Sequence, residues 1–305
     1  MQILRKTVKD PDFIELNSVQ KGSWINSMNP SKEEVQKLIT ELKLDEEIIE
    51  DFLDENSVPR IETDEGITYF LIRVPVTEKK LLKTTTLGIV VTEAFILTMT
   101  PESSLQLINY FLENKNIFTT QKTKFVLRLL DKTIESYEKK TDYLNKEVNK
   151  KRRQLQKLSN QDIATMVEFE ESLNDFISAL VPITIIINKI KAGKILQVYE
   201  QDQELLEDLL ISANDSLQLS KSRIKTITNI REAHTTILSN NLNKTMKLLT
   251  AITIVLTIPT IISSIYGMNI PLPIQAENNA FLYIIIIILL ISAGLILVFK
   301  KQDWI

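Results

Sequence analysis

Five hydroxyl side chains recur at regular spacing in an apolar segment near the C-terminus. Thr250, Thr253, Thr257, Thr260 and Ser264 follow one another at steps of three, four, three and four residues. This spacing places all five on one face of a helix. Such hydroxyls either bond their own backbone and join neighbouring helices, or line a water-filled pore. We expect the pore, which needs several copies of the chain because one helix cannot enclose water.

The same face continues toward the N-terminus with Asn243, Met246 and Leu249. Flexible or bulky apolar side chains repeated around a ring can close a pore by dewetting, so Met246 and Leu249 are candidate gate residues. At the other end the helix should break at Gly267, and Asn269 just beyond could present a ring of amide oxygens. No charge lies in the stripe, so cation selection would use dipoles rather than carboxylates.

Other kinds of site are poorly represented in this sequence. The chain has no cysteine and one histidine, His234, so disulfides, thiolate metal sites and histidine-based catalysis are not expected. The glycines are scattered and form no phosphate-binding loop. The net charge of −3 gives no reason to expect a nucleic-acid partner. We therefore predict neither an enzyme nor an organic cofactor, and we interpret His234 as structural.

The elements that carry the stripe begin with a mixed α/β domain over residues 1–120. A capping box at Ser31 and Glu34 predicts a helix over 32–43, and "EEIIEDFLDE" predicts a second. The β-branched and aromatic stretches 66–76 and 86–100 predict strands, with a hairpin connection at 92–94. The fold class expected here is α+β, a sheet flanked by helices.

Long cytoplasmic helices follow over residues 121–245. One is predicted at 122–159, a second at 161–192, and a third runs from near Glu200 to Gly267. The apolar stretch "FISALVPITIII" in the second is too short to cross a bilayer and should pack on a neighbour.

The third helix carries apolar residues along one seam. Either a core within the chain or a symmetric oligomer would explain this seam. Its members are Leu206, Leu210, Ala213, Leu217, Ile224, Ile227, His234 and Leu238.

Two membrane spans are predicted at the C-terminal end. Segments 246–265 and 280–299 are long and apolar enough to cross as helices, separated by an outer loop at 266–279. Lysines flank the spans on the sides away from this loop, and a basic tail covers 300–305. The excess of positive charge predicts a multi-pass protein of the cell membrane (inner or plasma) with both termini in the cytoplasm.

The run Tyr266-Gly267-Met268-Asn269, directly after one span and shortly before another, is similar to the signature of the CorA family of magnesium channels. The basic tail "KKQDWI" and the stretches "SWINS" and "IIEDFLDENSVPRIE" also find counterparts. The resemblance covers the whole chain.

The resemblance implies a homopentameric funnel in which first spans line the pore and second spans form an outer ring against membrane lipid. It implies Mg²⁺ as transported and regulatory ion, with Co²⁺ as a possible cargo. The selectivity filter would be Gly267, Met268 and Asn269. A metal site between subunits would use Asp51 and Asp208. The pore and gate positions, from the resemblance and from the stripe together, are Asn243, Met246, Leu249, Thr253, Thr257 and Thr260.

Two alternatives remain open. The zinc-transporting branch of the same superfamily shares the two-span layout but usually replaces the methionine of the signature, and Met268 argues against it. A membrane-anchored coiled-coil scaffold or sensor would conduct no ions, and the hydroxyl stripe would then join helices.

Overall fold

The computed structural model describes residues 1–55, 57–78, 81–102, 105–193 and 195–305. The chain divides into two compact units, Met1–Ile230 and Arg231–Ile305. One helix contributes residues to both units. In chain order the helices are α1 (Lys32–Leu42), α2 (Glu46–Asp51), α3 (Gln106–Glu113), α4 (Lys122–Arg152), α5 (Asn160–Lys191), α6 (Glu200–Tyr266) and α7 (Ala280–Lys301), with a 3-10 turn at Leu155–Lys157.

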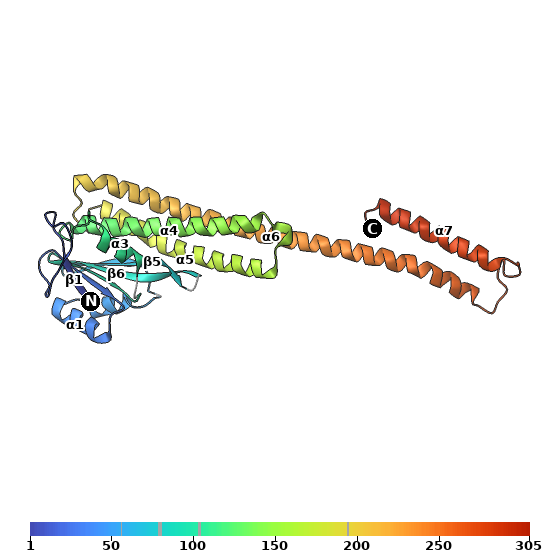
Figure 1. Cartoon of the computed structure of the whole chain (residues 1–305), viewed down its shortest axis with the longest axis horizontal. Coiled ribbons are helices and arrows are strands. Elements are labelled where there is room, and N and C mark those ends of the chain that lie inside the picture. Colours follow the sequence, from blue (N-terminus) through green and yellow to red (C-terminus); the bar gives the residue numbers. More distant parts are fainter. Residues whose placement is uncertain (56, 79–80, 103–104, 194) are drawn as a thin grey trace. The chain divides into compact units, whose positions relative to one another are not determined.

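Within the described residues, the first unit holds a seven-stranded sheet with the order β2-β1-β3-β7-β6-β5-β4 (Figure 1). All neighbouring strands are antiparallel except β3 and β7. The predicted hairpin is confirmed, because β6 and β7 pair and the Thr92 N–H donates to the Phe95 carbonyl at 3.0 Å. The strands are β1 (Gln2–Arg5), β2 (Ile14–Glu15), β3 (Ser23–Met28), β4 (Arg60–Asp64), β5 (Ile67–Glu78), β6 (Leu81–Val91) and β7 (Phe95–Thr100).

Helices cover both faces of the sheet, as predicted. Along β5, Phe70 and Ile72 join one buried cluster, whereas Tyr69 and Leu71 join another on the opposite face. The alternation follows from the two-residue period of a strand, and a strand buried on both faces reads as a continuous apolar run. The first cluster contains residues of α4, α5 and α6, and the second contains residues of α1 and α2. Figure 1 shows α1 across the sheet from α4 and α5.

Helix α2 ends at Asp51, earlier than predicted, because the next residue enters the core. Phe52 is fully buried, and its ring lies against Gly88, where an added Cβ would stand 1.9 Å from Phe52 Cδ2. The Thr86 hydroxyl donates to the Asp54 carbonyl at 2.7 Å and ties the following turn to β6. These contacts hold the end of α2, and with it Asp51, against the sheet.

The first long helix, α4, ends at Arg152 rather than near residue 159. Its last turn carries Lys150, Lys151 and Arg152, cations that interact favourably with a helix C-terminus. Helix α5 then starts with a capping box between Ser159 and Asp162. Lys151 bonds Asp162 and holds the pKa of that carboxyl well below its usual range. The chain therefore turns between Arg152 and Asn160, where the sequence predicted that the first helix would continue to residue 159.

The seam predicted along the third long helix packs within the first unit over most of its length. Leu206, Ala213, Leu217 and Ile227 are buried in the cluster that also holds residues of α4 and α5. Leu238, in the second unit, is exposed. A core within the chain therefore accounts for the seam through Ile227.

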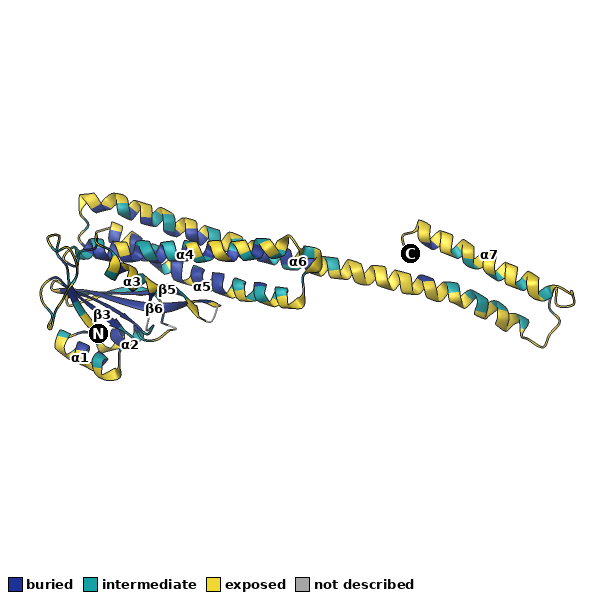
Figure 2. Ribbon diagram, in the orientation of Figure 1, coloured by how far each residue is buried: buried dark blue, intermediate teal, exposed yellow. Residues whose placement is uncertain are grey.

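Among the described residues, three helices are long and apolar enough to cross a membrane: α5, α6 and α7. The whole of α5 is therefore long and apolar enough, although its most apolar stretch, "FISALVPITIII", is predicted to be too short to cross alone. In its most apolar window, however, 44% of residues are buried, against 6% in α6 and 0% in α7. Phe176 and Ile183 of α5 lie in the core cluster, which confirms that this stretch packs on its neighbours. Figure 2 shows α7 and the second half of α6 mostly exposed, and most of the exposed large apolar side chains among the described residues lie there.

Replacing Gly88 with Ala should destabilise the first unit by about 1–3 kcal/mol, the usual cost of overpacking a filled core. The new methyl group would overlap the Phe52 ring. Thermal unfolding of the full-length protein in detergent should show a lower midpoint. The control Gly294→Ala, with nothing within 4 Å of the added Cβ, should not change it. A Phe52→Ala, Gly88→Ala double variant should lose less than the two single changes combined, and an unchanged midpoint for Gly88→Ala alone would contradict the prediction.

Candidate ion pathway and cation-sensing residues

The hydroxyls of α6 bond their own helix. Thr253 donates to the Leu249 carbonyl at 2.9 Å, Thr257 to the Thr253 carbonyl at 2.7 Å, and Thr260 to the Leu256 carbonyl at 3.2 Å. The protons of these three hydroxyls are therefore used inside the helix, which is one of the two alternatives considered above. The oxygen lone pairs remain available as acceptors, and all three threonines are exposed in the single chain. The stripe thus presents hydrogen-bond acceptors, the polarity that suits water molecules around a cation.

The opposite face of α6 is the one that α7 covers. In the second unit, α7 runs back alongside the end of α6 (Figure 1). The least exposed positions of that part of α6 are Ala251, Val255, Ile258, Pro259, Ile262 and Tyr266. Those of α7 are Ala280, Ile284, Ile288, Ser292, Leu295 and Phe299. At about 100° per residue, the covered face of α6 is centred roughly 180° from the hydroxyl stripe. The stripe therefore does not join α6 to its own α7.

The gate candidates lie on the uncovered face. The side chains of Met246 and Leu249 are 54% and 58% exposed, and Asn243 is also exposed. Next to them the chain's tail folds back. The Trp304 ring stacks on the Phe299 ring with centroids 5.4 Å apart, and the backbone N–H of Trp304 donates to the Phe299 carbonyl at 3.0 Å.

Trp304 also lines a groove together with residues of α6, a role for the tail that sequence patterns did not indicate. The other lining residues are Asn240, Asn243, Lys244, Met246, Lys247 and Thr250.

The filter candidates follow the end of α6 in a hydrogen-bonded turn. The Gly267 N–H donates to the Ser263 carbonyl at 2.9 Å, and an added Cβ at Gly267 would stand 3.2 Å from that oxygen. The Tyr266 hydroxyl donates to the Pro273 carbonyl at 3.4 Å and links the two ends of the turn. Gly267, Met268 and Asn269 are exposed. The break predicted at Gly267 therefore occurs there, and it leaves Asn269 exposed to solvent.

The two candidate sensing aspartates do not meet within one chain. Asp51 ends α2, which packs on one face of the sheet, whereas Asp208 is exposed on α6, which packs on the other. Asp51 is also not bare. Arg60 Nη2 lies 2.6 Å from Asp51 Oδ2, and Arg60 Nε bonds Glu62. This pairing joins residues across a turn, and no sequence pattern indicated it.

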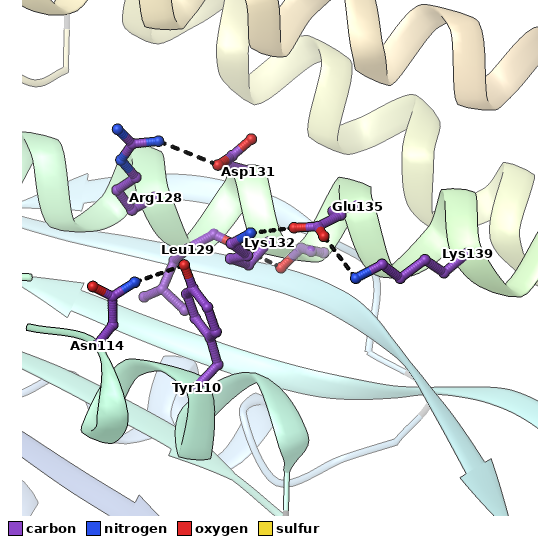
Figure 3. Close-up of polar contacts among 9 residues, drawn as sticks. Tyr110, Asn114, Arg128, Leu129, Asp131, Lys132, Glu135 and Lys139 are labelled. Atoms are coloured by element: carbon purple, nitrogen blue, oxygen red, sulfur yellow. Dashed lines mark hydrogen bonds and ion pairs between the residues drawn. The ribbon is translucent and has the colours of Figure 1, made fainter. Parts of the chain in front are cut away.

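A denser charged cluster between α3 and α4 is already paired (Figure 3). Glu135 bonds both Lys132 and Lys139, and these bonds lower the pKa of its carboxyl. The Lys132 ammonium lies 4.7 Å from the centre of the Tyr110 ring, and Asn114 Nδ2 donates to the Tyr110 hydroxyl at 2.6 Å. The cluster therefore joins α3 to α4. No group of three or more metal-binding side chains occurs among the residues that the structure describes.

Comparison with solved structures defines the fold. The complete CorA magnesium transporter from Methanocaldococcus jannaschii matches with a TM-score of 0.88 and 20% identity, over 100% of this chain and 98% of that one. The cytoplasmic domain of ZntB from Vibrio parahaemolyticus matches with a TM-score of 0.63 and 8% identity, over 80% of this chain and 98% of that one. At these identities the likeness establishes the fold, an α+β domain on long helices followed by an apolar C-terminal helix.

The family model described as CorA-like Mg²⁺ transporter protein matches residues 19–301, and the chain belongs to this family. In sequence, the cobalt/magnesium transport protein CorA of M. jannaschii is 23% identical over an alignment of 295 residues, which covers 92% of this chain and 91% of that protein. The family is one of membrane transporters and not of enzymes. The resemblance read from the signature is thus confirmed at the level of the family.

Labelling of single cysteines can test the two faces of α6, because the natural chain has none. Thr257→Cys, on the hydroxyl face, should react with a water-soluble, membrane-impermeant thiol reagent in liposomes. Ile258→Cys, next in sequence but on the face covered by α7, should react far more slowly, because the thiolate that reacts needs water. Equal rates at both positions would contradict a wet hydroxyl face.

Proposed function

We propose that this chain is the subunit of a homopentameric channel that carries Mg²⁺, with Co²⁺ as a second cargo, into the cell. The observation that carries the proposal is the uncovered polar face of α6. Its acceptors point away from α7, and lipid offers them no partner. Five such helices around an axis would turn this face toward water. Family membership supports the same arrangement, with α7 in an outer ring against lipid.

The proposed topology has two spans and an outer loop. The C-terminal half of α6 crosses first and α7 crosses back, so that residues 266–279 face outward. Lys244 and Lys247 precede the first span, and Lys300 and Lys301 follow the second. The positive-inside bias therefore supports both termini in the cytoplasm of a cell membrane.

In this channel the Asn269 amides form the selectivity filter together with Gly267 and Met268. Mg²⁺ gives up its water reluctantly, so a ring of oxygens that accepts hydrogen bonds from the hydration shell costs less than a dry cage. The threonines continue the same chemistry along the pore, since each presents an acceptor oxygen. Inward flow needs no fuel, because a divalent ion gains about 4.6 kcal/mol per 100 mV of inside-negative potential, twice the single-charge value.

Met246 and Leu249 form the gate at the cytoplasmic end. Both are apolar, and both lie on the uncovered face beside Asn243. Rings of these side chains, brought close together, would expel water and stop the ion. Asn243 then offers amide oxygens at the cytoplasmic mouth.

Closure is controlled by Mg²⁺ held between Asp51 of one subunit and Asp208 of the next. Their separation on opposite faces of the sheet supports a site shared by two subunits, and carboxylate oxygens are ligands that suit Mg²⁺. When internal Mg²⁺ is high, the bridges hold the subunits in the closed state. When it falls, the bridges empty and the population shifts toward open states.

Mg²⁺ flux into liposomes that contain only this protein tests the proposal against its alternatives. Flux at low internal Mg²⁺ supports the channel. No flux for any divalent ion would favour a scaffold or sensor, and Zn²⁺ flux in the absence of Mg²⁺ flux would favour a zinc transporter.

Asn269→Ala should reduce Mg²⁺ flux at least about tenfold, because each subunit loses an amide acceptor worth about 1 kcal/mol or more. Stopped-flow fluorescence with a Mg²⁺ dye inside the liposomes measures the flux, and light scattering checks assembly. Asn279→Ala is the matched control, since that asparagine lies in the same loop and makes no side-chain cap bond to α7. Undiminished flux in Asn269→Ala would show that the filter is elsewhere.

Asp208→Lys should weaken inhibition by internal Mg²⁺, because a cation replaces one of the two carboxylates that hold the ion. The Mg²⁺ concentration for half-inhibition should rise at least about tenfold, as expected from the loss of an attraction of about 1.4 kcal/mol or more. Glu171→Lys, which reverses the charge of an exposed acid on α5, serves as control. Inhibition identical to that of the natural protein would remove Asp208 from the sensing site.

A further inference from the structure

Arg60 forms an ion pair with Asp51, the aspartate on which the proposed sensing site depends. Its Nη2 lies 2.6 Å from Asp51 Oδ2, and its Nε bonds Glu62. The side chains of Arg60, Asp51 and Glu62 are 34%, 40% and 42% exposed, so the group is open to solvent and to ions. One guanidinium therefore joins the end of α2 to the edge strand β4.

The positive charge at this position is permanent. An arginine does not lose its proton at physiological pH, and the hydrogen bonds to Glu62 and Asp51 raise its pKa further. A divalent ion that approaches Asp51 thus meets a carboxylate oxygen already in use and a cation beside it. The ion and the guanidinium compete for the same negative charge.

Glu62 offers the guanidinium a second partner. Arg60 and Glu62 stand two residues apart on β4, so their side chains leave the same face of the strand. If Arg60 releases Asp51, it keeps the bond that its Nε already makes to Glu62. When an ion displaces Arg60 from Asp51, the arginine therefore remains paired with Glu62.

We propose that Arg60 is a built-in competitor of the divalent cation at Asp51, and that the Asp51–Arg60–Glu62 group sets the Mg²⁺ concentration at which the channel closes. This rests on the sensing role of Asp51 within the proposed function. Two residues that do not touch the ion, Arg60 and Glu62, then shift the closing concentration set at Asp51. A stronger hold of Arg60 on Asp51 raises it, and a weaker hold lowers it.

Two substitutions should move the threshold in opposite directions. Arg60→Gln removes the competitor, so the Mg²⁺ concentration that gives half-maximal protection of the protein against limited proteolysis should fall roughly three- to tenfold. Glu62→Gln removes the second partner, so Arg60 should hold Asp51 more firmly and this concentration should rise roughly two- to fivefold. Arg60→Lys keeps the charge and should lie closer to the natural protein. A purely structural role would not produce shifts of opposite sign.

The experiment measures protection of purified full-length protein in detergent against limited proteolysis, over a series of Mg²⁺ concentrations, together with flux in liposomes. Arg128→Gln is the matched control, because it removes an arginine from an exposed ion pair with Asp131 on α4. Its midpoint should equal that of the natural protein. Thermal unfolding without Mg²⁺ checks that each variant is folded.

Asp51→Asn separates failure of this inference from failure of the sensor. If Asp51→Asn loses protection while Arg60→Gln and Glu62→Gln keep the natural midpoint, the sensor stands and the competition is overturned. If Asp51→Asn keeps full protection, the proposed sensing site is wrong, and the inference falls with it. Opposite shifts for Arg60→Gln and Glu62→Gln, both absent in the Asp51→Asn background, support the competition.

Discussion

A polar face on a helix that crosses lipid is best satisfied by water or by other protein groups, and the proposed channel depends on this constraint. In α6 the threonines use their protons on their own backbone and present oxygens outward. Helix α7 covers the other side, so it contributes no partner to these oxygens. In the proposed pentamer, water around the axis supplies that partner, which hydrocarbon cannot do because it neither accepts nor donates hydrogen bonds.

The first unit, Met1–Ile230, places charged side chains on two sides of one sheet. Strand β5 is buried on both faces, so one face carries α1 and α2 and the other carries α4, α5 and part of α6. Asp51 and Asp208 therefore point from opposite sides of the same subunit. In the proposed channel, this separation leaves Asp51 and Asp208 to meet between neighbouring subunits, so that occupancy of the proposed site would depend on how the subunits are arranged.

Two contacts near Asp51 bear on the proposed sensing site. Phe52 against Gly88 ends α2 at Asp51 and holds it to the sheet, and Arg60 then determines how much of the aspartate's charge is available. Neither Phe52 nor Arg60 resembles a metal ligand. Both act on the same carboxylate, one through packing and the other through charge, so in the proposed sensor the end of α2 would link the core to the binding of the ion.

Local and periodic features could be predicted from the sequence by itself. The capping box at Ser31, the hairpin after Val91, the long helix to Tyr266 and the single hydroxyl face all follow from residue types at fixed spacing along a few turns. The family followed from a short signature. The tertiary structure alone decided that α7 covers the face opposite the hydroxyls, that α4 turns back at Arg152, and that Asp51 is paired with Arg60. These depend on which distant surfaces meet in space, and spacing along one segment carries no information about them.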